Sequence, residues 1–496
     1  MRTFVWISVL AATTVPAMAP SLRAQPELKA YYKDDFILED AGKNFQLKIR
    51  GNMHLDARAY QCEGECGSPH SLDLRRARID LQGRVHQWFE FRIQPEFADK
   101  PHLRNAWVDV GRYPWLHLRA GQMKVPFSSA WATLDNNLNF IERGSSTPFY
   151  TFFDRGVMVW GEILDGTIVP SLGIFTGAGS ELDVNSGDID DAKDLAGRLF
   201  LQPFKPLGLA PLSGLFLVAQ GTWGRMSAPT TRYETGGMRS ANYESALWRW
   251  RTEQTLGSDG RVTDSITATV DSRTRWGLEG HYLLGPFALS CEYLEVLYDN
   301  IVVHHQLIEG SSRRVNEKIF NTDATLRSFS VFASFFITGE SKSLSTWGWK
   351  TARPTSSLGE GGLGAVEVLA RYSRTWTDPK LFEVHKVQGF AAGDSALPDG
   401  YGAALPGASN RIKAAVLDGA SEVHEFTGGL SWTVNPMIRL QLNDVFLWAP
   451  DIDRDGDGKN DNWILSGNRS DRSDLERKNT PVPWENAVMA RLILKI

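Results

Sequence analysis

Several basic side chains in the first quarter of the chain fall at positions of one parity. Arg76, Arg78 and Arg84 share one parity, and side chains two apart in a β-strand point to the same face. A guanidinium offers paired N–H donors that match the oxygens of phosphate and related oxyanions. A row of them facing a confined aqueous space would raise the local concentration of small anions. The candidates for such an anion pathway are Arg76, Arg78, Arg92, Arg119, Lys124 and Arg143.

Acidic residues share the same parity. Asp80 lies between Arg78 and Arg84, and Glu90 lies beside Arg92. Each arginine could therefore form a salt bridge that braces neighbouring strands without contacting a solute. Basic side chains outnumber acidic ones on the expected inward faces, whereas the whole chain has a formal net charge of −5. An anion pathway and a set of bracing salt bridges both stay open at this point.

An acidic stretch near the C-terminus has the spacing of a calcium loop. Acids alternate with other residues there and a glycine stands at the bend, as in such loops. The twelfth position counted from Asp453 is Ile464, where a glutamate would normally complete the shell. A solvated acidic turn explains the same residues. If calcium binds, the expected ligands are Asp453, Asp455, Asp457 and Asp461, and no other cofactor is expected.

Three cysteines permit at most one disulfide within the chain. Cys62 and Cys66 lie four apart in a segment that contains glycine and glutamate, and we expect them to close a small external loop. A metal site would need more thiol or imidazole ligands, and His70 is the only nearby histidine. A disulfide is therefore the favoured interpretation.

The elements that must position these side chains are strands of unusual length. From residue 44 to 59 every odd position is apolar or glycine and every even position is polar. Such a strand needs an apolar medium on one side and water on the other. A tilted strand of roughly 9 to 11 residues crosses a bilayer, and only a closed sheet survives there. The pattern predicts an all-β fold, a transmembrane antiparallel β-barrel.

We expect sixteen such strands. An even count lets both chain ends lie on the periplasmic side, with short turns inside and long loops outside, although 14 or 18 would satisfy the same rule. The alternation stops from Gln122 to Phe153, and residues 339–363 form an unusually long periplasmic connection. The expected strands are 44–60, 76–85, 89–97, 103–111, 115–121, 157–163, 168–174, 192–203, 213–225, 273–284, 287–299, 325–338, 364–376, 422–433, 437–448 and 486–496.

Composition agrees with this division of the chain. Residues 1–24 carry Arg2, an apolar run from Phe4 to Val15 and then small residues, which predicts a signal peptide. Residues 25–43 would form a periplasmic N-terminal segment. No linker interrupts residues 44–496, which we expect to form one barrel domain. A mean hydropathy of −0.26 is too polar for a helical membrane protein but fits strands that face water on one side.

Short motifs recur in order along the chain: LRRAR at 74–78, GQMKVPF at 121–127, FIER at 140–143, GRLF at 197–200, TGE at 338–340 and ARYS at 370–373. Through them residues 44–496 resemble the phosphate-selective porin O and P family of outer-membrane channels. The resemblance implies a homotrimer of sixteen-stranded barrels in which the third external loop folds into the lumen. That loop would be residues 122–153. The last residue, Ile496, departs from the aromatic residue that usually ends such barrels.

The sequence therefore predicts a passive diffusion channel of the bacterial outer membrane that prefers small anions such as phosphate, polyphosphate or similar oxyanions. The interrupting segment balances Lys124 and Arg143 with Asp135 and Glu142, so a general or neutral-solute porin is the alternative. An outer-membrane enzyme is less favoured, since no Gly-x-Ser-x-Gly elbow occurs. The expected partners are small anions, outer-membrane lipid, lipopolysaccharide and other copies of the chain, but not nucleic acid.

Overall fold

The computed structural model describes residues 28–33, 35–98, 101–177, 191–209, 211–225, 238–239, 241, 245–250, 253–256, 262–309, 312–383, 385–387, 412–414, 417–454, 456–467 and 480–495. The predicted signal peptide and Ile496 lie outside these residues. No helix within them is long and apolar enough to cross a membrane.

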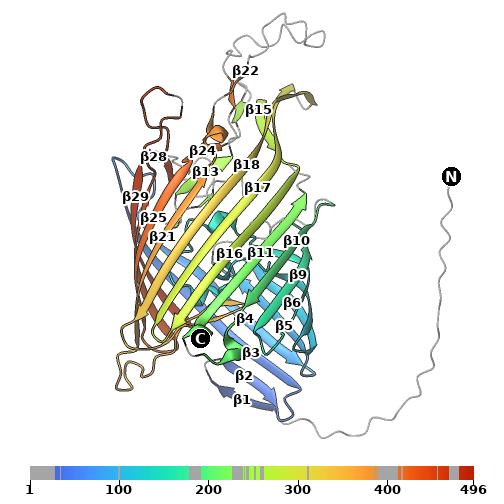
Figure 1. Ribbon diagram of the computed structural model, residues 1–496, viewed down its shortest axis with the longest axis vertical. Coiled ribbons are helices and arrows are strands. Elements are labelled where there is room, and N and C mark those ends of the chain that lie inside the picture. Colours follow the sequence, from blue (N-terminus) through green and yellow to red (C-terminus); the bar gives the residue numbers. More distant parts are fainter. Residues whose placement is uncertain are drawn as a thin grey trace, which may run out of the picture.

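Sixteen antiparallel strands close into a barrel (Figure 1). Closure comes from the last strand pairing with the first barrel strand, from Glu485 opposite Cys62 to Lys495 opposite Asn52. The predicted sixteen-stranded barrel is therefore confirmed. Its strands are β3 (Phe45–Cys62), β4 (Ser71–Val85), β5 (Phe89–Glu96), β6 (His102–Tyr113), β7 (Leu116–Lys124), β8 (Phe153–Trp160), β9 (Ile168–Phe175), β10 (Asp194–Leu201), β11 (Leu215–Arg225), β16 (Ser272–Leu284), β17 (Phe287–Glu309), β18 (Ser312–Phe336), β21 (Ala365–Thr377), β25 (Glu422–Thr433), β26 (Ile438–Trp448) and β29 (Trp484–Lys495).

The two faces of each strand have the environments that the alternation predicts. On β3 the inward His54, Asp56 and Arg58 are buried, while the outward Leu55 is 37% exposed. Leu172 on β9 is 65% exposed. No other part of the described chain covers these outward apolar faces, so hydrocarbon is the medium that can solvate them.

Further strands extend both ends of the barrel. At the end where the C-terminus lies, β1 (Leu28–Tyr32) and β2 (Phe36–Asp40) form a hairpin that continues the sheet, with Phe36 opposite Ile49 of β3 (Figure 1). This hairpin falls in the segment that the sequence analysis left without strands. At the other end, β14 (Glu253–Leu256) and β15 (Val262–Thr269) extend the sheet along β17.

A second, five-stranded sheet joins the external loops. It consists of β12 (Met238–Arg239), β13 (Ala246–Trp250), β24 (Leu417–Gly419), β27 (Ile464–Ser466) and β28 (Thr480–Val482). Trp248 of β13 is fully buried, and its ring lies 6.5 Å from that of Phe149 in the third external loop. Two more strands, β22 (His385–Val387) and β23 (Ile412–Ala414), pair with each other, and η5 (Pro379–Phe382) precedes them.

The third external loop, between Lys124 and Phe153, lies inside the barrel. It contains α1 (Ser129–Ala132), η1 (Asp135–Asn137) and η2 (Thr147–Phe149). Its apolar side chains Phe127 and Ile141 are fully buried. We call this segment loop 3. Two other short helices, η3 (Lys205–Leu207) and η4 (Leu212–Gly214), belong to the turn before β11.

The long periplasmic connection rises into the lumen and meets loop 3. Its β19 (Ser343–Ser345) and β20 (Gly348–Lys350) form a hairpin, which we call the inner hairpin. Trp349 donates its backbone N–H to Thr133 Oγ1 at 2.9 Å. Gly348 has a φ of +95°, and a Cβ there would lie 2.4 Å from the Thr133 backbone nitrogen, so only glycine permits this approach. Loop 3 thus narrows the lumen from the external side, and the inner hairpin narrows it from the periplasmic side.

Candidate functional site

A β-bulge in β4 turns two successive arginines into the lumen. His54 of β3 lies opposite Arg76, but Leu55 lies opposite Leu74, so Arg75 is the extra residue. A bulge of this kind re-aims a side chain. Strict alternation would place Arg75 on the outward face, and the sequence analysis therefore omitted it from the candidates.

The Asp135 carboxylate of loop 3 contacts three of the predicted arginines. Its carboxylate lies 3.2 Å from Arg76 Nε and 3.0 Å from Arg143 Nη2, and it accepts a short hydrogen bond from Arg78 Nη1. Arg78 also donates Nε to Glu96 at 2.5 Å. Burial alone would raise the pKa of Asp135, but the three guanidiniums hold it well below its usual range. The charged form of Asp135 therefore fixes η1 against β4.

The Glu142 carboxylate of loop 3 also contacts three arginines. Its Oε1 lies 2.9 Å from Arg58 Nη2, 3.0 Å from Arg75 Nε and 3.2 Å from Arg491 Nη2. Burial again opposes ionisation, yet the surrounding arginines hold the pKa of Glu142 well below its usual range. Arg58 and Arg491 also contact Asp56, at 2.6 Å each. Glu142 thus links loop 3 to three wall strands, β3, β4 and β29.

These two centres form one basic cluster. Counting only the ion pairs described above, six guanidiniums meet four carboxylates, so six minus four leaves a charge of +2 for these ten groups. Carboxylates hold the guanidiniums in place, and the excess sets the sign of the local field. We call this set the arginine cluster: Arg58, Arg75, Arg76, Arg78, Arg143 and Arg491 with Asp56, Glu96, Asp135 and Glu142.

Two other predicted pathway residues, Arg92 and Arg119, pair with carboxylates outside the arginine cluster. Arg92 donates Nε and Nη2 to Asp80, at 2.8 and 2.7 Å. Arg119 donates Nε to Asp109 at 2.8 Å, and its guanidinium carbon lies 4.1 Å from the ring centroid of Trp107. Arg92 and Arg119 therefore form neutral pairs outside the arginine cluster.

Lys124 holds the first turn of loop 3. Its Nζ donates to the carbonyl oxygens of Trp131 and Thr133, both at 2.7 Å, and lies 4.7 Å from the Trp131 ring centroid. Arg143 donates Nη2 to the same Thr133 carbonyl at 3.0 Å. All six predicted pathway residues thus have acceptors within the protein, and their contact with a solute stays a prediction.

On the opposite wall, carboxylates hold loop 3. Glu292 accepts from Ser128 Oγ at 2.5 Å, and its cross-strand neighbour Glu279 accepts from the Ser129 backbone N–H at 2.9 Å. Glu425 accepts from the Ser145 backbone N–H at 2.7 Å. Between loop 3 and these strands lies a cavity of about 60 Å³ that Arg143 also lines. Sequence parity predicted that Glu279 and Glu292 face inward, but it predicted neither the inward position of Glu425 nor that these glutamates hold the loop.

The acidic stretch has partners of its own. Asp453 accepts backbone N–H groups of Gly456 at 2.6 Å and Gly458 at 2.8 Å. Asp461 accepts from the backbone N–H of Arg454 at 2.9 Å, and Asp457 contacts Lys459 at 3.0 Å. These bonds shape the turn whether or not an ion is bound. Asp455 lies outside the described residues, so calcium binding stays a prediction.

Cys62 and Cys66 form a disulfide with their Cα atoms 5.4 Å apart. In the part of the chain that the structure describes, three possible metal-ligand groups come together only at these two cysteines and Glu485. Because both thiols are used in the disulfide, this group offers one carboxylate and is no metal site.

Comparisons with known proteins agree with this architecture. The family model described as phosphate-selective porin O and P matches residues 47–443. No curated protein sequence matches the chain. Among solved structures, OmpT of Vibrio cholerae is 11% identical over 91% of this chain and 98% of its own, with a TM-score of 0.47.

Two other solved structures give similar values. The anion-selective porin from Comamonas acidovorans is 10% identical over 91% of this chain and 100% of its own, with a TM-score of 0.48. The channel DcaP of Acinetobacter baumannii is 10% identical over 92% and 99%, with a TM-score of 0.43. Similarity at this level carries no argument about function, and the family match decides the assignment. The chain belongs to the phosphate-selective porin O and P family and is a channel of the bacterial outer membrane.

Proposed function

We propose that this channel conducts small solutes by passive diffusion and prefers anions, with phosphate-like oxyanions as the substrate class. The observation that carries the proposal is the +2 charge of the arginine cluster, which lies where loop 3 meets β3, β4 and β29. The carboxylates of the cluster fix its guanidiniums, so its field needs no reorganisation when an anion arrives. The family match supports the same substrate class.

One observation favours a less selective channel. Arg92 and Arg119 each face a carboxylate, and Arg76 is only 4% exposed. If the arginine cluster is shielded from the solute path, its charges brace the barrel, and neutral solutes would pass as readily as anions. This was the alternative that the sequence left open.

Reversal potentials separate the two functions. The purified protein would be inserted in a planar bilayer across a tenfold gradient of potassium chloride. An anion-preferring channel shifts the reversal potential toward the chloride equilibrium potential, and added phosphate should reduce the chloride current. A reversal potential near zero would leave only the general porin, and a shift toward the potassium potential would exclude anion preference.

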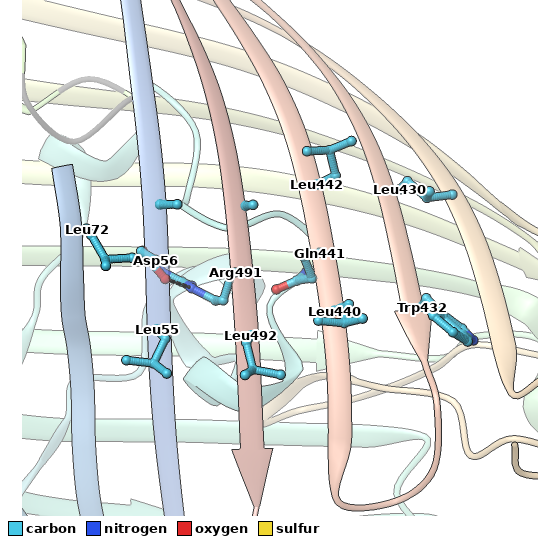
Figure 2. A pocket seen from close by; sticks show the side chains of 12 residues that line it. Leu55, Asp56, Leu72, Leu430, Trp432, Leu440, Gln441, Leu442, Arg491 and Leu492 are labelled. Atoms are coloured by element: carbon cyan, nitrogen blue, oxygen red, sulfur yellow. Dashed lines mark hydrogen bonds and ion pairs between the residues drawn. The ribbon is translucent and has the colours of Figure 1, made fainter. Parts of the chain in front are cut away.

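We also propose that the channel is a homotrimer whose contact face includes β3, β26 and β29. A groove of about 410 Å³ runs over the outward face of these strands (Figure 2). Ala57 and Ala490, which lie opposite each other on β3 and β29, line it together with leucines such as Leu55, Leu442 and Leu492. Small residues in the lining let another wall approach closely.

A polar pair on the same face supports a protein neighbour. Asp444 is exposed on the outward face of β26, and its carboxylate accepts from Asn486 Nδ2 at 2.7 Å. It lies between Trp448 and Leu442 on the outward face of the strand, where hydrocarbon alone would disfavour a carboxylate. A second copy could solvate it.

Native mass spectrometry tests the trimer. Ala490→Trp places a large side chain in the groove and should shift the protein from trimer toward monomer. Ala219→Trp makes the same change on the outward face of β11, a strand that does not line the groove, and should leave the trimer intact. A monomeric wild type, or two variants that behave alike, would contradict the proposed interface.

A further inference from the structure

One buried arginine joins the inner hairpin to loop 3. Arg198 of β10 is 5% exposed, and its Nη2 donates to Ser129 Oγ of loop 3 at 2.7 Å. Its Nη1 donates a short hydrogen bond to the carbonyl oxygen of Thr346, at the tip of the inner hairpin. A single guanidinium therefore contacts the element that narrows the lumen from the external side and the element that narrows it from the periplasmic side.

A second arginine makes the same connection on another wall. Arg439 of β26 is 2% exposed and donates Nε to Ser431 Oγ of β25 at 2.8 Å. Its Nη1 donates to the carbonyl oxygen of Leu138 in loop 3 at 3.0 Å, and to Thr351 Oγ1, directly after the inner hairpin, at 3.3 Å. In one direction β11, β16, β17, β18, β21 and β25 separate β10 from β26, and the other eight barrel strands separate them in the other direction. The two arginines thus lie on nearly opposite walls.

Carbonyl and hydroxyl oxygens accept the hydrogen bonds of both guanidiniums. In the part of the chain that the structure describes, no ion pair includes Arg198 or Arg439. Apart from Ser431 Oγ, all their acceptors belong to loop 3 or to residues 346–351. A buried charge is costly unless hydrogen bonds satisfy it. Withdrawal of either element would leave both charges with fewer acceptors, so each element stabilises the position of the other.

Loop 3 and the inner hairpin also contact each other directly, through neutral groups. Trp349 donates its backbone N–H to Thr133 Oγ1, and Thr351 donates Oγ1 to Asn137 Oδ1 at 3.1 Å. A hydrogen bond between neutral groups contributes little net stability, because water can replace either partner, whereas a bond to a charged group contributes more. The buried guanidiniums are therefore the groups that make separation of the two elements costly.

We propose that Arg198 and Arg439 are positioning residues that couple loop 3 to the inner hairpin, so that the two sides of the constriction keep one position together. Neither residue is among the six predicted pathway residues. Their role is to fix the width of the pore, and it requires only that the protein is a channel, not that it prefers anions. A lysine at position 198 would keep the charge but lacks the planar pair of terminal nitrogens with which Arg198 reaches both elements.

Single-channel recording in a planar bilayer tests the coupling. Loss of one hydrogen bond to a charged group shifts an equilibrium by roughly tenfold. In Arg198→Gln the channel should therefore spend about tenfold more time away from the main open level of wild type. Arg198→Lys keeps the charge and should behave as Arg198→Gln does. Arg225→Lys, on the outward face of β11, is the control and should match wild type.

Two results of these recordings would overturn the proposal. Arg198→Gln could keep the single open level of wild type, which would mean that the bridge does not hold the constriction. Arg198→Lys alone could keep it, which would mean that the charge matters and the two-element contact does not. A wild-type channel without anion preference would refute the proposed selectivity and leave the expected difference between Arg198→Gln and wild type unchanged.

Hydrogen exchange of the detergent-purified channel separates coupling from local damage. In Arg439→Gln, amide exchange should rise about tenfold both in residues 129–138 and in residues 343–350, because both elements lose a charged partner. Ser129→Ala changes only loop 3, keeps Arg198 and should also raise exchange in residues 343–350. Heat-dependent gel mobility shows that each variant is folded. Exchange that rises in only one of the two elements, in either variant, would overturn the proposal.

Discussion

Asp135 offers the sharpest test of whether the arginine cluster acts on the permeating ion. Asp135→Asn keeps the shape of the side chain but removes one negative charge, which raises the cluster from +2 to +3. A unit charge about 8 Å from an ion in water contributes about 0.5 kcal/mol. An anion is then enriched roughly twofold and a cation depleted by the same factor. The anion-to-cation permeability ratio should rise about fivefold, and less in concentrated salt.

The opposite change should reverse the effect. Arg76→Gln lowers the cluster from +2 to +1, so the permeability ratio should fall by a similar factor. Arg225→Gln, on the outer surface, is the matched control and should change neither reversal potential nor conductance. The assay is the reversal potential in a planar bilayer under a potassium chloride gradient.

If the arginines only stabilise the barrel and do not act on the ion, a different result is expected. Removing Asp135 deprives three buried arginines of their shared carboxylate, and breaking a buried pair costs on the order of 3–5 kcal/mol. Stability would then fall in both Asp135→Asn and Arg76→Gln, while the permeability ratio of each stays at the wild-type value. That outcome would refute the field argument and leave the arginines as structural groups.

Three further predictions concern the elements around the cluster. Trp349→Ala should cost about 3–5 kcal/mol and raise single-channel conductance, since Trp349 is 2% exposed and anchors the inner hairpin; the exposed Trp115→Ala is its control. The pKa of Asp135 is depressed, so its stabilisation is complete above the unfolded pKa and is lost only as pH falls below about 4; equal Tm losses on acidification to about pH 3 in wild type and Asp135→Asn would contradict this. Millimolar calcium should raise the Tm of wild type but not of Asp453→Asn if the acidic loop binds it, and equal Tm values would remove that prediction.

The sequence could predict the barrel because the membrane acts on every residue of a strand. Hydrocarbon on one side and water on the other impose a period of two, so β3 appears in the sequence at 44–60 and in the structure at Phe45–Cys62. The hairpin of β1 and β2 was missed because it lies beyond the barrel, where no hydrocarbon enforces the alternation.

The inner hairpin could not be found in the same way. Its strands β19 and β20 have three residues each, too short to show a period. Its position depends on Trp349 meeting Thr133 and Phe332, residues that are distant in the sequence. The sequence indicated only that this connection is unusually long.

The arginines show the same limit at the candidate site. Parity placed Arg76 and Arg78 in the lumen, but their shared partner Asp135 belongs to a loop that has no periodicity. The bulge at Arg75 also breaks the parity that the prediction used. The wall supplies more arginine than carboxylate around this point, and loop 3 supplies Asp135 and Glu142. On this side of the lumen loop 3 is therefore held by the charge that would attract an anion, so selectivity and loop position should change together when that charge is altered.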